Sequence, residues 1–282
     1  MNMLAQSVNL SVTLKEAFAF SDSHETLWLL EKATGLTVTQ LRLADENAVL
    51  TSEAKNLFAH MIEQRRKHIP LQYILGSWEF MGLPMECCPG VLIPRGDTEI
   101  LATEAIRFLK NCPDNPIALD LCTGSGCVGV SLAHFCPKAR ITAVDINETT
   151  LALAKKNAAM NGVGDRISFV QSDLFENISS RFHCITANPP YIPTGEIAGL
   201  SEEVRQEPVL ALDGGPDGLD FYRAIISNCK NYLHPDGVIF FEIGDTQGET
   251  VARMLQDCGF KDVVIIKDLE SRDRVVRGRI EG

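Results

Sequence analysis

The chain has 282 residues, of which 45% are hydrophobic and 22% are charged, and its formal net charge is -11. This length and composition are typical of a globular protein with more than one domain and are neither those of a disordered chain nor those of a membrane protein. The acidic balance argues against a direct nucleic-acid substrate, because binding draws on neutralised phosphates, although a local basic patch such as Arg65, Arg66 and Lys67 could suffice. The N-terminus has no basic stretch followed by an apolar one, and no run of about 18 apolar residues occurs. We therefore expect a cytoplasmic protein with no membrane segment.

The nine cysteines and six histidines do not form a recognisable metal site. The cysteines lack the paired spacing of zinc or redox motifs, and their odd number is untypical of a disulfide framework. We interpret them as small buried hydrophobic residues and predict no bound metal.

Residues 1–80 are predicted to form a small helical domain. Thr51 or Ser52 is a suitable N-cap for a helix with apolar residues at the three-and-four spacing of an amphipathic face. The sequence by itself favours a packed bundle that serves folding. Docking of a large substrate is the functional role that we assign to this domain as a hypothesis.

From Gln72 to Pro94, aromatic and β-branched residues are interrupted by glycine and proline, which is typical of a hairpin-like connector. We place a hairpin linker at 81–95 and a larger domain at 96–282. In this larger domain, predicted strands and helices alternate with short connections. The pattern predicts an α/β fold with a mostly parallel, doubly wound sheet. The strands are expected near 117–121, 140–145, 167–171, 182–187, 238–243, 262–267 and 274–279.

A glycine-containing loop, Asp120-Leu-Cys-Thr-Gly124-Ser-Gly126, ends the first of these strands and opens a helix. Glycine lets the backbone approach a ligand at the carboxyl ends of parallel strands. The G-x-G-x-x-G pattern of dinucleotide sites is absent, because Cys122 stands at its first glycine position. The loop is therefore predicted to contact a different cofactor through Cys122, Thr123, Gly124, Ser125 and Gly126.

Carboxylates end three successive predicted strands at Asp120, Asp145 and Asp173. Asp145 lies about 20 residues beyond the glycines, where a carboxylate can accept both hydroxyls of a ribose. Asp173 is placed to meet an adenine amino group with Leu174 on the ring, and Asp120 to orient a cationic group directly or through water. This acidic lining suits S-adenosyl-L-methionine, which carries a sulfonium and an ammonium and no phosphate. Ordinary strand-end turns are the alternative.

The motif Asn188-Pro-Pro-Tyr191 follows the strand expected at 182–187. Its two prolines fix φ and remove two N–H donors, which predicts a stiff loop with unpaired carbonyls. A planar amide or exocyclic amino nitrogen could donate to the Asn188 side-chain oxygen and the Pro189 carbonyl while Tyr191 packs against it. We therefore predict that Asn188, Pro189, Pro190 and Tyr191 bind the substrate and catalyse methyl transfer by positioning. An ordinary Asn-Pro turn is the alternative.

These motifs and several others resemble, over almost the whole chain, the family of peptide chain release factor glutamine methyltransferases (the HemK/PrmC family). The other motifs lie outside the general methyltransferase core. They are Gln72-Tyr-Ile-Leu-Gly76 with Glu79-Phe80, Leu92-Ile-Pro-Arg95-x-Asp-Thr-Glu99, Glu207-Pro208 with Ala211-Leu-x-Gly-Gly215-x-Asp-Gly-Leu219, and Glu242-Ile-Gly244.

The resemblance implies a helical domain joined by a hairpin to a Rossmann-like class I methyltransferase domain with a seven-stranded sheet. It implies methylation of the side-chain N5 of glutamine in the Gly-Gly-Gln motif of class 1 peptide chain release factors. It also implies that Cys122 to Gly126, Asp145, Leu174 and Asn188 contact S-adenosyl-L-methionine. Cys122 departs from the glycine that is usual in the family, and Leu174 from a bulkier aromatic residue.

An N6-adenine DNA methyltransferase, or another protein or RNA methyltransferase, is the alternative within the same chemistry. A DNA enzyme must flip its base and usually carries a basic recognition domain, of which the sequence shows no sign. A binding module that has lost activity is the alternative from another class. The long, acidic segment 192–218 is a candidate for closing over a substrate.

Overall fold

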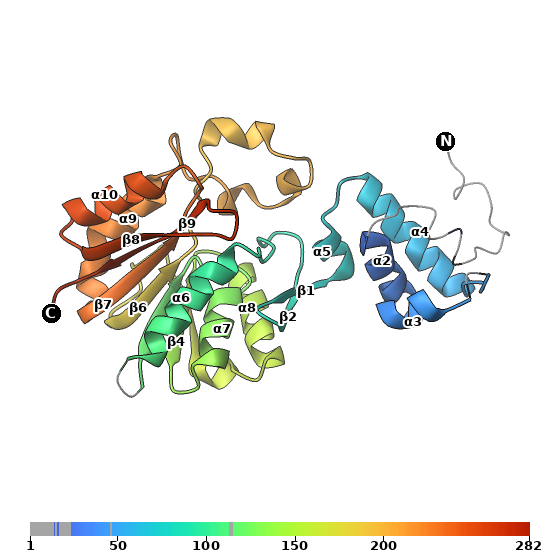
Figure 1. Ribbon diagram of the computed structural model, residues 1–282, viewed down its shortest axis with the longest axis horizontal. Coiled ribbons are helices and arrows are strands. Elements are labelled where there is room, and N and C mark those ends of the chain that lie inside the picture. The colour runs from blue at the N-terminus through green and yellow to red at the C-terminus, as the bar shows by residue number, and fades with distance from the viewer. Residues whose placement is uncertain (1–13, 15, 17–23, 46, 113–114) are drawn as a thin grey trace. The chain divides into compact units, whose positions relative to one another are not determined.

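The computed structural model describes residues 14, 16, 24–45, 47–112 and 115–282 (Figure 1). The chain divides into two compact units, Met1–Gly76 and Ser77–Gly282. Most of the first 23 residues of the predicted helical domain lie outside the described residues. No helix of the described part is long and apolar enough to cross a membrane.

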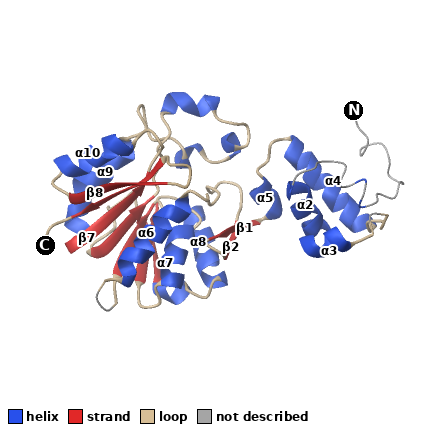
Figure 2. Ribbon diagram, viewed as in Figure 1, coloured by secondary structure: helices blue, strands red, loops and turns tan. Residues whose placement is uncertain are grey.

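The first unit is helical in its described part (Figure 2). Thr51 is the N-cap of α4, because its hydroxyl accepts a hydrogen bond from the amide of Ala54 at 3.2 Å. Gly76 ends the last helix in the left-handed conformation that favours glycine, with φ 73°. The helices of this unit are α2 His24–Thr34, α3 Val38–Leu43, α4 Ser52–Arg66 and α5 Leu71–Leu75.

A hairpin opens the second unit, and the predicted linker at 81–95 is wrong in its bounds. Strand β1 (Ser77–Phe80) pairs antiparallel with β2 (Leu83–Glu86). The turn between them consists of Met81 and Gly82, both with positive φ, as two-residue hairpin turns of type I′ require. Methionine rarely adopts this conformation, so the sequence pattern did not reveal where the turn lies. Residues 87–95 form no strand and instead reach the site described below.

The second unit is built on a seven-stranded sheet with the order β5-β4-β3-β6-β7-β9-β8. Five neighbouring strands are parallel, and β9 is antiparallel to both of its neighbours. The prediction of a mostly parallel, doubly wound sheet is confirmed. The strands are β3 Ile117–Leu121, β4 Arg140–Asp145, β5 Ile167–Gln171, β6 Phe182–Ala187, β7 Leu233–Glu242, β8 Lys261–Lys267 and β9 Asp273–Arg279.

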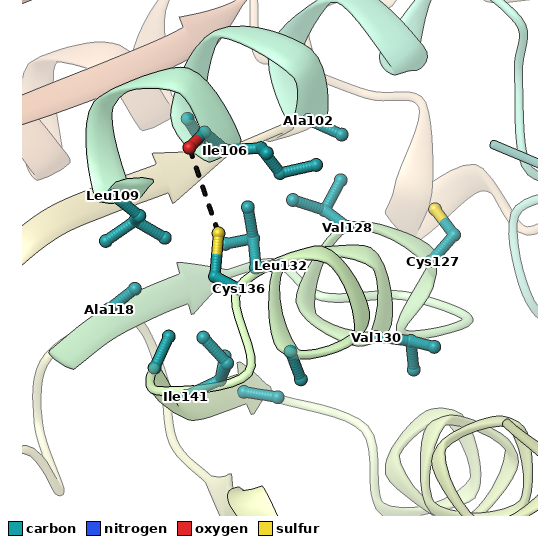
Figure 3. Close-up of a cluster of buried hydrophobic side chains, with 14 of the residues drawn as sticks. Ala102, Ile106, Leu109, Ala118, Cys127, Val128, Val130, Leu132, Cys136 and Ile141 are labelled. Atoms are coloured by element: carbon teal, nitrogen blue, oxygen red, sulfur yellow. Dashed lines mark hydrogen bonds between the residues drawn. The ribbon is translucent and has the colours of Figure 1, made fainter. Parts of the chain in front are cut away.

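Helices cover both faces of this sheet and create two apolar cores (Figure 1). On one face, α6 packs over β6 and β7, α7 over β3 and β4, and α8 over β4 and β5. Cys136, just after α7, donates its thiol hydrogen to the carbonyl of Ile106 in α6 (Figure 3). On the other face lie α9 and α10. The helices are α6 Thr98–Lys110, α7 Cys127–Phe135, α8 Glu148–Met160, α9 Asp220–Cys229 and α10 Gly248–Asp257.

The strand order reverses between β3 and β6, because the chain moves outward through β4 and β5 before it returns. Open α/β sheets bind ligands at the carboxyl edge of such a reversal. The segment 192–218 lies beyond that edge of β6 and folds into three short 3-10 helices: Thr194–Gly199, Val204–Gln206 and Val209–Ala211. Its closure over a substrate stays a prediction.

Candidate active site

A cavity of about 210 Å³, here the strand-end cavity, opens at the carboxyl edge of the sheet. It brings together residues that the sequence separates widely: Cys122, Gly124, Asp145, Asp173, Leu174, Asn188 and Pro190. Thr123 and Ser125 line the crevice directly beside it, which Cys122, Gly124 and Asn188 also reach. Gly126 lines neither space and instead lies against Ala154 of α8.

The glycine loop adopts backbone conformations that few residues tolerate. Gly124 and Gly126 have φ of 56° and 81°, and Cys122 has φ of 55° although it carries a Cβ atom. The amide of Thr123 donates to the carbonyl of Val144 at 2.9 Å, which holds the loop against the end of β4. Burial and the nearby carboxylates raise the pKa of the Cys122 thiol, so this side chain stays neutral.

Asp120 is 2% exposed, and the protein itself uses both of its oxygens. Oδ2 accepts from the hydroxyl of Thr123 at 2.6 Å and the amide of Gly129 at 3.1 Å, and Oδ1 accepts from the hydroxyl of Thr186 at 2.8 Å. Burial raises the pKa of Asp120 to about 6 against the opposing effect of these bonds. The geometry therefore gives Asp120 a role in holding the loop, α7 and β6 together. Asp120 also lines the crevice beside the cavity, and its expected role of orienting a cationic group directly or through water stays a prediction.

The carboxylates at the next two strand ends face the strand-end cavity. Asp145 accepts hydrogen bonds from the amides of Gly124 and Asn147, both at 3.0 Å, and burial raises its pKa. Each of its oxygens has capacity for a further donor. Asp173 is exposed. Leu174 beside it has a positive φ of 44°, a backbone conformation that is unusual for leucine. No lysine, arginine or histidine is among the described residues that line this cavity.

Asn188 stands where three spaces meet, because it lines the strand-end cavity, the neighbouring crevice and a further pocket next to Tyr191. Its side-chain nitrogen donates to the hydroxyl of Thr98 at 3.3 Å, and its side chain also interacts with the carboxylate of Glu242 and lowers the pKa of that group. With the NH2 group held in this way, the side-chain oxygen Oδ1 is the atom left for a ligand. Thr98 and Glu242 were absent from the predicted site, although both belong to motifs that the resemblance singled out.

The further pocket, here the Tyr191 pocket, has a volume of about 460 Å³ and includes Arg95, Asp97, Asn188, Tyr191 and Glu242. Burial raises the pKa of the Tyr191 phenol to about 12, so it is neutral at physiological pH. Burial likewise raises the pKa of Glu242 to about 7. The pocket therefore combines a planar ring with hydrogen-bond acceptors.

A hydrogen bond from a distant side chain holds the backbone carbonyl of the residue after the second proline. The Tyr191 carbonyl accepts from Nε2 of Gln247 at 2.9 Å, so the expectation of unpaired carbonyls is wrong at this residue. The sequence did not reveal this hydrogen bond, because its donor, Gln247, lies at the start of α10, far from Tyr191 in the chain. A Cβ atom on Gly218 would lie 2.3 Å from the same carbonyl, which explains why glycine occupies this position.

A buried ion pair joins two segments at the rim of these spaces. Glu207 is 4% exposed and pairs with the guanidinium of Arg95, and it also accepts from the amide of Ile93 at 3.0 Å. Pro208, immediately after it, lines the strand-end cavity, whereas Arg95 lines the Tyr191 pocket. Glu207 was missed as a site residue because its partners lie more than a hundred positions away.

Comparison with known proteins gives consistent matches over both units. Residues 9–76 match the PrmC N-terminal domain, and residues 103–204 match the methyltransferase small domain. The release factor glutamine methyltransferase of Geobacter sulfurreducens is 43% identical over 258 residues, which cover 91% of this chain and 89% of that protein. The protein of the same name from Thermodesulfovibrio yellowstonii is 39% identical over 86% of this chain and 87% of its own length.

Solved structures of lower sequence identity share the fold. A methyltransferase from Pyrococcus furiosus has a TM-score of 0.52 at 17% identity, and the match covers 72% of this chain and 91% of that one. A 16S rRNA methyltransferase of T. thermophilus, solved with AdoMet and guanosine, has a TM-score of 0.54 at 19% identity over 73% of this chain and 50% of its own. These likenesses support the class I methyltransferase fold.

Proposed function

The chain belongs to the release factor glutamine methyltransferase family, and we propose that it methylates the side-chain N5 of the glutamine in the Gly-Gly-Gln motif of class 1 peptide chain release factors. The observation that carries this proposal is the position of Asn188, which borders both the strand-end cavity and the Tyr191 pocket. One side chain can thus meet a cofactor on one side and an acceptor amide on the other.

The strand-end cavity suits S-adenosylmethionine, which supplies an electrophilic methyl group on a sulfonium. We assign Asp145 to the ribose hydroxyls, Asp173 to the adenine amino group and Leu174 to the face of the ring. The turns at Cys122 to Gly126 allow the backbone close to the ligand. The absence of basic residues among the described lining supports a cationic cofactor over a phosphate-bearing one.

The Tyr191 pocket suits a planar amide. We assign its two N–H groups to Oδ1 of Asn188 and the carbonyl of Pro189, with Tyr191 packed against the amide plane and Pro190 keeping the loop stiff. These contacts orient the nitrogen lone pair along the line of displacement. As the N–C bond forms, the C–S bond breaks and its electron pair stays with sulfur, and the nitrogen then loses one proton. Positioning supplies much of the rate gain.

Release factors are the proposed partners, and the helical unit Met1–Gly76 is the proposed docking module for them. The net charge of -11 supports a protein acceptor over DNA. No basic recognition domain of the kind that base-flipping enzymes use was evident in the sequence.

The experiment is methyl transfer from labelled S-adenosylmethionine to a purified class 1 release factor. It is run beside a Gly-Gly-Ala version of the factor and unmethylated DNA. Label on the unaltered factor alone supports both the substrate and the acceptor side chain. Label on DNA alone refutes the proposed substrate while keeping the chemistry.

A further inference from the structure

Glu242 is a buried carboxylate at the carboxyl end of β7 that the proposed mechanism has not used. It is 2% exposed and lines the Tyr191 pocket together with Asn188. The side chains of Thr98 and Asn188 interact with it and lower its pKa, yet its Oε2 atom has no hydrogen-bond partner in the described structure. A buried polar oxygen without a partner is costly, so its presence beside a pocket points to a ligand.

The ionised carboxylate can only accept hydrogen bonds. It therefore requires Asn188 to turn its NH2 group toward Glu242 and Thr98, which leaves Oδ1 to face the opposite way. A protonated or amide side chain at 242 could also donate, and Asn188 could then rotate by half a turn. An inverted Asn188 would present N–H groups to an acceptor nitrogen that itself carries N–H groups.

We propose that Glu242 is a positioning residue for methyl transfer: as a carboxylate it holds Oδ1 of Asn188 toward the acceptor nitrogen. Its unpartnered oxygen also places negative charge beside that nitrogen as it becomes cationic during transfer. This inference rests on the proposed function and adds a residue to it.

Charged and titratable groups from several elements surround this carboxylate. The positive charge of Arg274 on β9 attracts the Glu242 carboxylate. Arg274 also pairs with Asp268 at 3.3 Å and with Asp97 at 3.4 Å, so its charge is shared among three carboxylates. The other groups facing it or its pocket are Arg95, Cys127, Tyr191 and Tyr222. With burial the largest effect, the pKa of Glu242 rises to about 7. The active, ionised form is therefore lost as the pH falls through 7.

The test compares full-length Glu242→Gln with Glu249→Gln, which removes the same charge from an exposed site on the first turn of α10. Initial rates on the purified release factor are measured from pH 5.5 to 9. We expect Glu242→Gln to lower kcat by roughly 10- to 100-fold, as when a supporting partner of an active-site group is lost. Its cofactor Kd should stay near the wild-type value, and the fall in kcat on the acid side should disappear. Glu242→Asp should recover part of the rate.

A second pair of variants keeps the inference testable if Glu242→Gln does not fold. Thr98→Val removes the hydroxyl that Asn188 and Glu242 share, whereas Thr98→Ser keeps it. We expect a loss of kcat in the first and nearly full kcat in the second. Equal rates in both, or an unchanged acid limb in Glu242→Gln, would overturn the role of Glu242.

One readout needs no acceptor and so separates this inference from the proposed function. The side-chain NH2 resonances of Asn188, assigned by their loss in Asn188→Asp, should shift with pH near 7 in the wild type and not in Glu242→Gln. If the wild type leaves the release factor unlabelled, the proposed function fails. If the chemical shifts of these resonances do not change with pH, the proposed role of Glu242 is refuted, whatever the acceptor is.

Discussion

At the residue scale, the site depends on side chains whose direction is set by partners from other elements. Asn188 follows β6, but the groups that orient it come from the start of α6 and the end of β7. Its own motif therefore supplies the side-chain amide and a stiff backbone, while Thr98 and Glu242 decide which of the two polar atoms of Asn188 faces the ligand.

Replacing Asn188 by alanine should nearly abolish methyl transfer. The variant loses the oxygen that we assign to the acceptor N–H, and loss of one such oriented group costs on the order of 100-fold or more in kcat. Cofactor binding, measured by calorimetry, should be largely retained because Asp145 and the glycine loop are intact. Asn228→Ala, at an exposed position of α9, is the control. Near-normal turnover of Asn188→Ala would remove this residue from the mechanism.

Glu242 should also make stability depend on pH. Its pKa rises from 4.5 to about 7 on folding, so the folded chain binds this proton more tightly than the unfolded chain. Its contribution to the free energy of unfolding is therefore most favourable below 4.5 and is lost as the pH rises through 7. Glu242→Gln should flatten this decline by up to about 3 kcal/mol between pH 5 and 8 in urea denaturation. The same slope in Glu242→Gln and in Glu249→Gln would contradict it.

At the element scale, two short connections shape the strand-end cavity. The glycine loop lets α7 begin directly against α8, and the Arg95 to Glu207 ion pair fastens the segment after the hairpin to the 3-10 helices of 192–218. The glycine loop has local hydrogen bonds of its own, among them the one from the Thr123 hydroxyl to Asp120, but local bonds are not all that hold these connections. Each depends on contact with an element far away in the chain.

Gly126→Ala should destabilise the protein more than Gly162→Ala does. Both glycines have positive φ, of 81° and 67°, which costs alanine about 1–2 kcal/mol. At Gly126 the new Cβ would also lie 2.9 Å from the Cβ of Ala154, whereas at Gly162 no atom lies within 4 Å. Overpacking should add about 1–3 kcal/mol to the loss for Gly126→Ala, measured by urea denaturation. Equal losses would show that the contact between α7 and α8 relaxes freely.

Arg95→Ala should loosen the rim of the cavity. It leaves the carboxylate of Glu207, which is 4% exposed, without its charged partner. Because the Arg95 side chain is 38% exposed, we expect a loss of about 1–3 kcal/mol, below that for a fully buried pair. Amide hydrogen exchange should accelerate in 204–211. Arg223→Ala, which removes an exposed ion pair with Asp217, should cost less than Arg95→Ala does, because solvent screens exposed pairs. Unchanged exchange in Arg95→Ala would show that the pair does not hold the segment.

At the scale of the whole molecule, the chain consists of two compact units that divide at Gly76. The second unit contains every residue that we assign to the cofactor and the acceptor amide, together with two apolar cores of its own. The proposed chemistry therefore lies within one unit, and recognition of the release factor is the role that we propose for the other.

Removing residues 1–76 should separate these roles. The remaining unit should fold and bind S-adenosylmethionine, since its cores and cavity are its own. Its kcat/KM should fall more on an intact release factor than on a short Gly-Gly-Gln peptide, because only the intact factor offers a surface for docking. Full-length protein on both substrates is the reference. Equal losses on the two substrates would show that the first unit serves folding rather than docking.

The sequence by itself determined the fold class, the family and the residues at the strand ends. The hydrophobic periodicity of strands and helices is visible in the sequence. Asp145, Asp173 and Asn188 lie at or just after the carboxyl ends of strands that meet at one edge of the sheet. These features are local, so short motifs carry them.

Only the tertiary structure decided which polar groups are free for a ligand. Asp120 turned out to be used within the protein, whereas Glu242 turned out to have an oxygen without a partner. Thr98 lies 90 positions from Asn188, and the partners of Glu207 lie more than 100 positions from it. Hydrogen bonding and burial between distant elements depend on how those elements pack, and no local pattern in the chain records that packing.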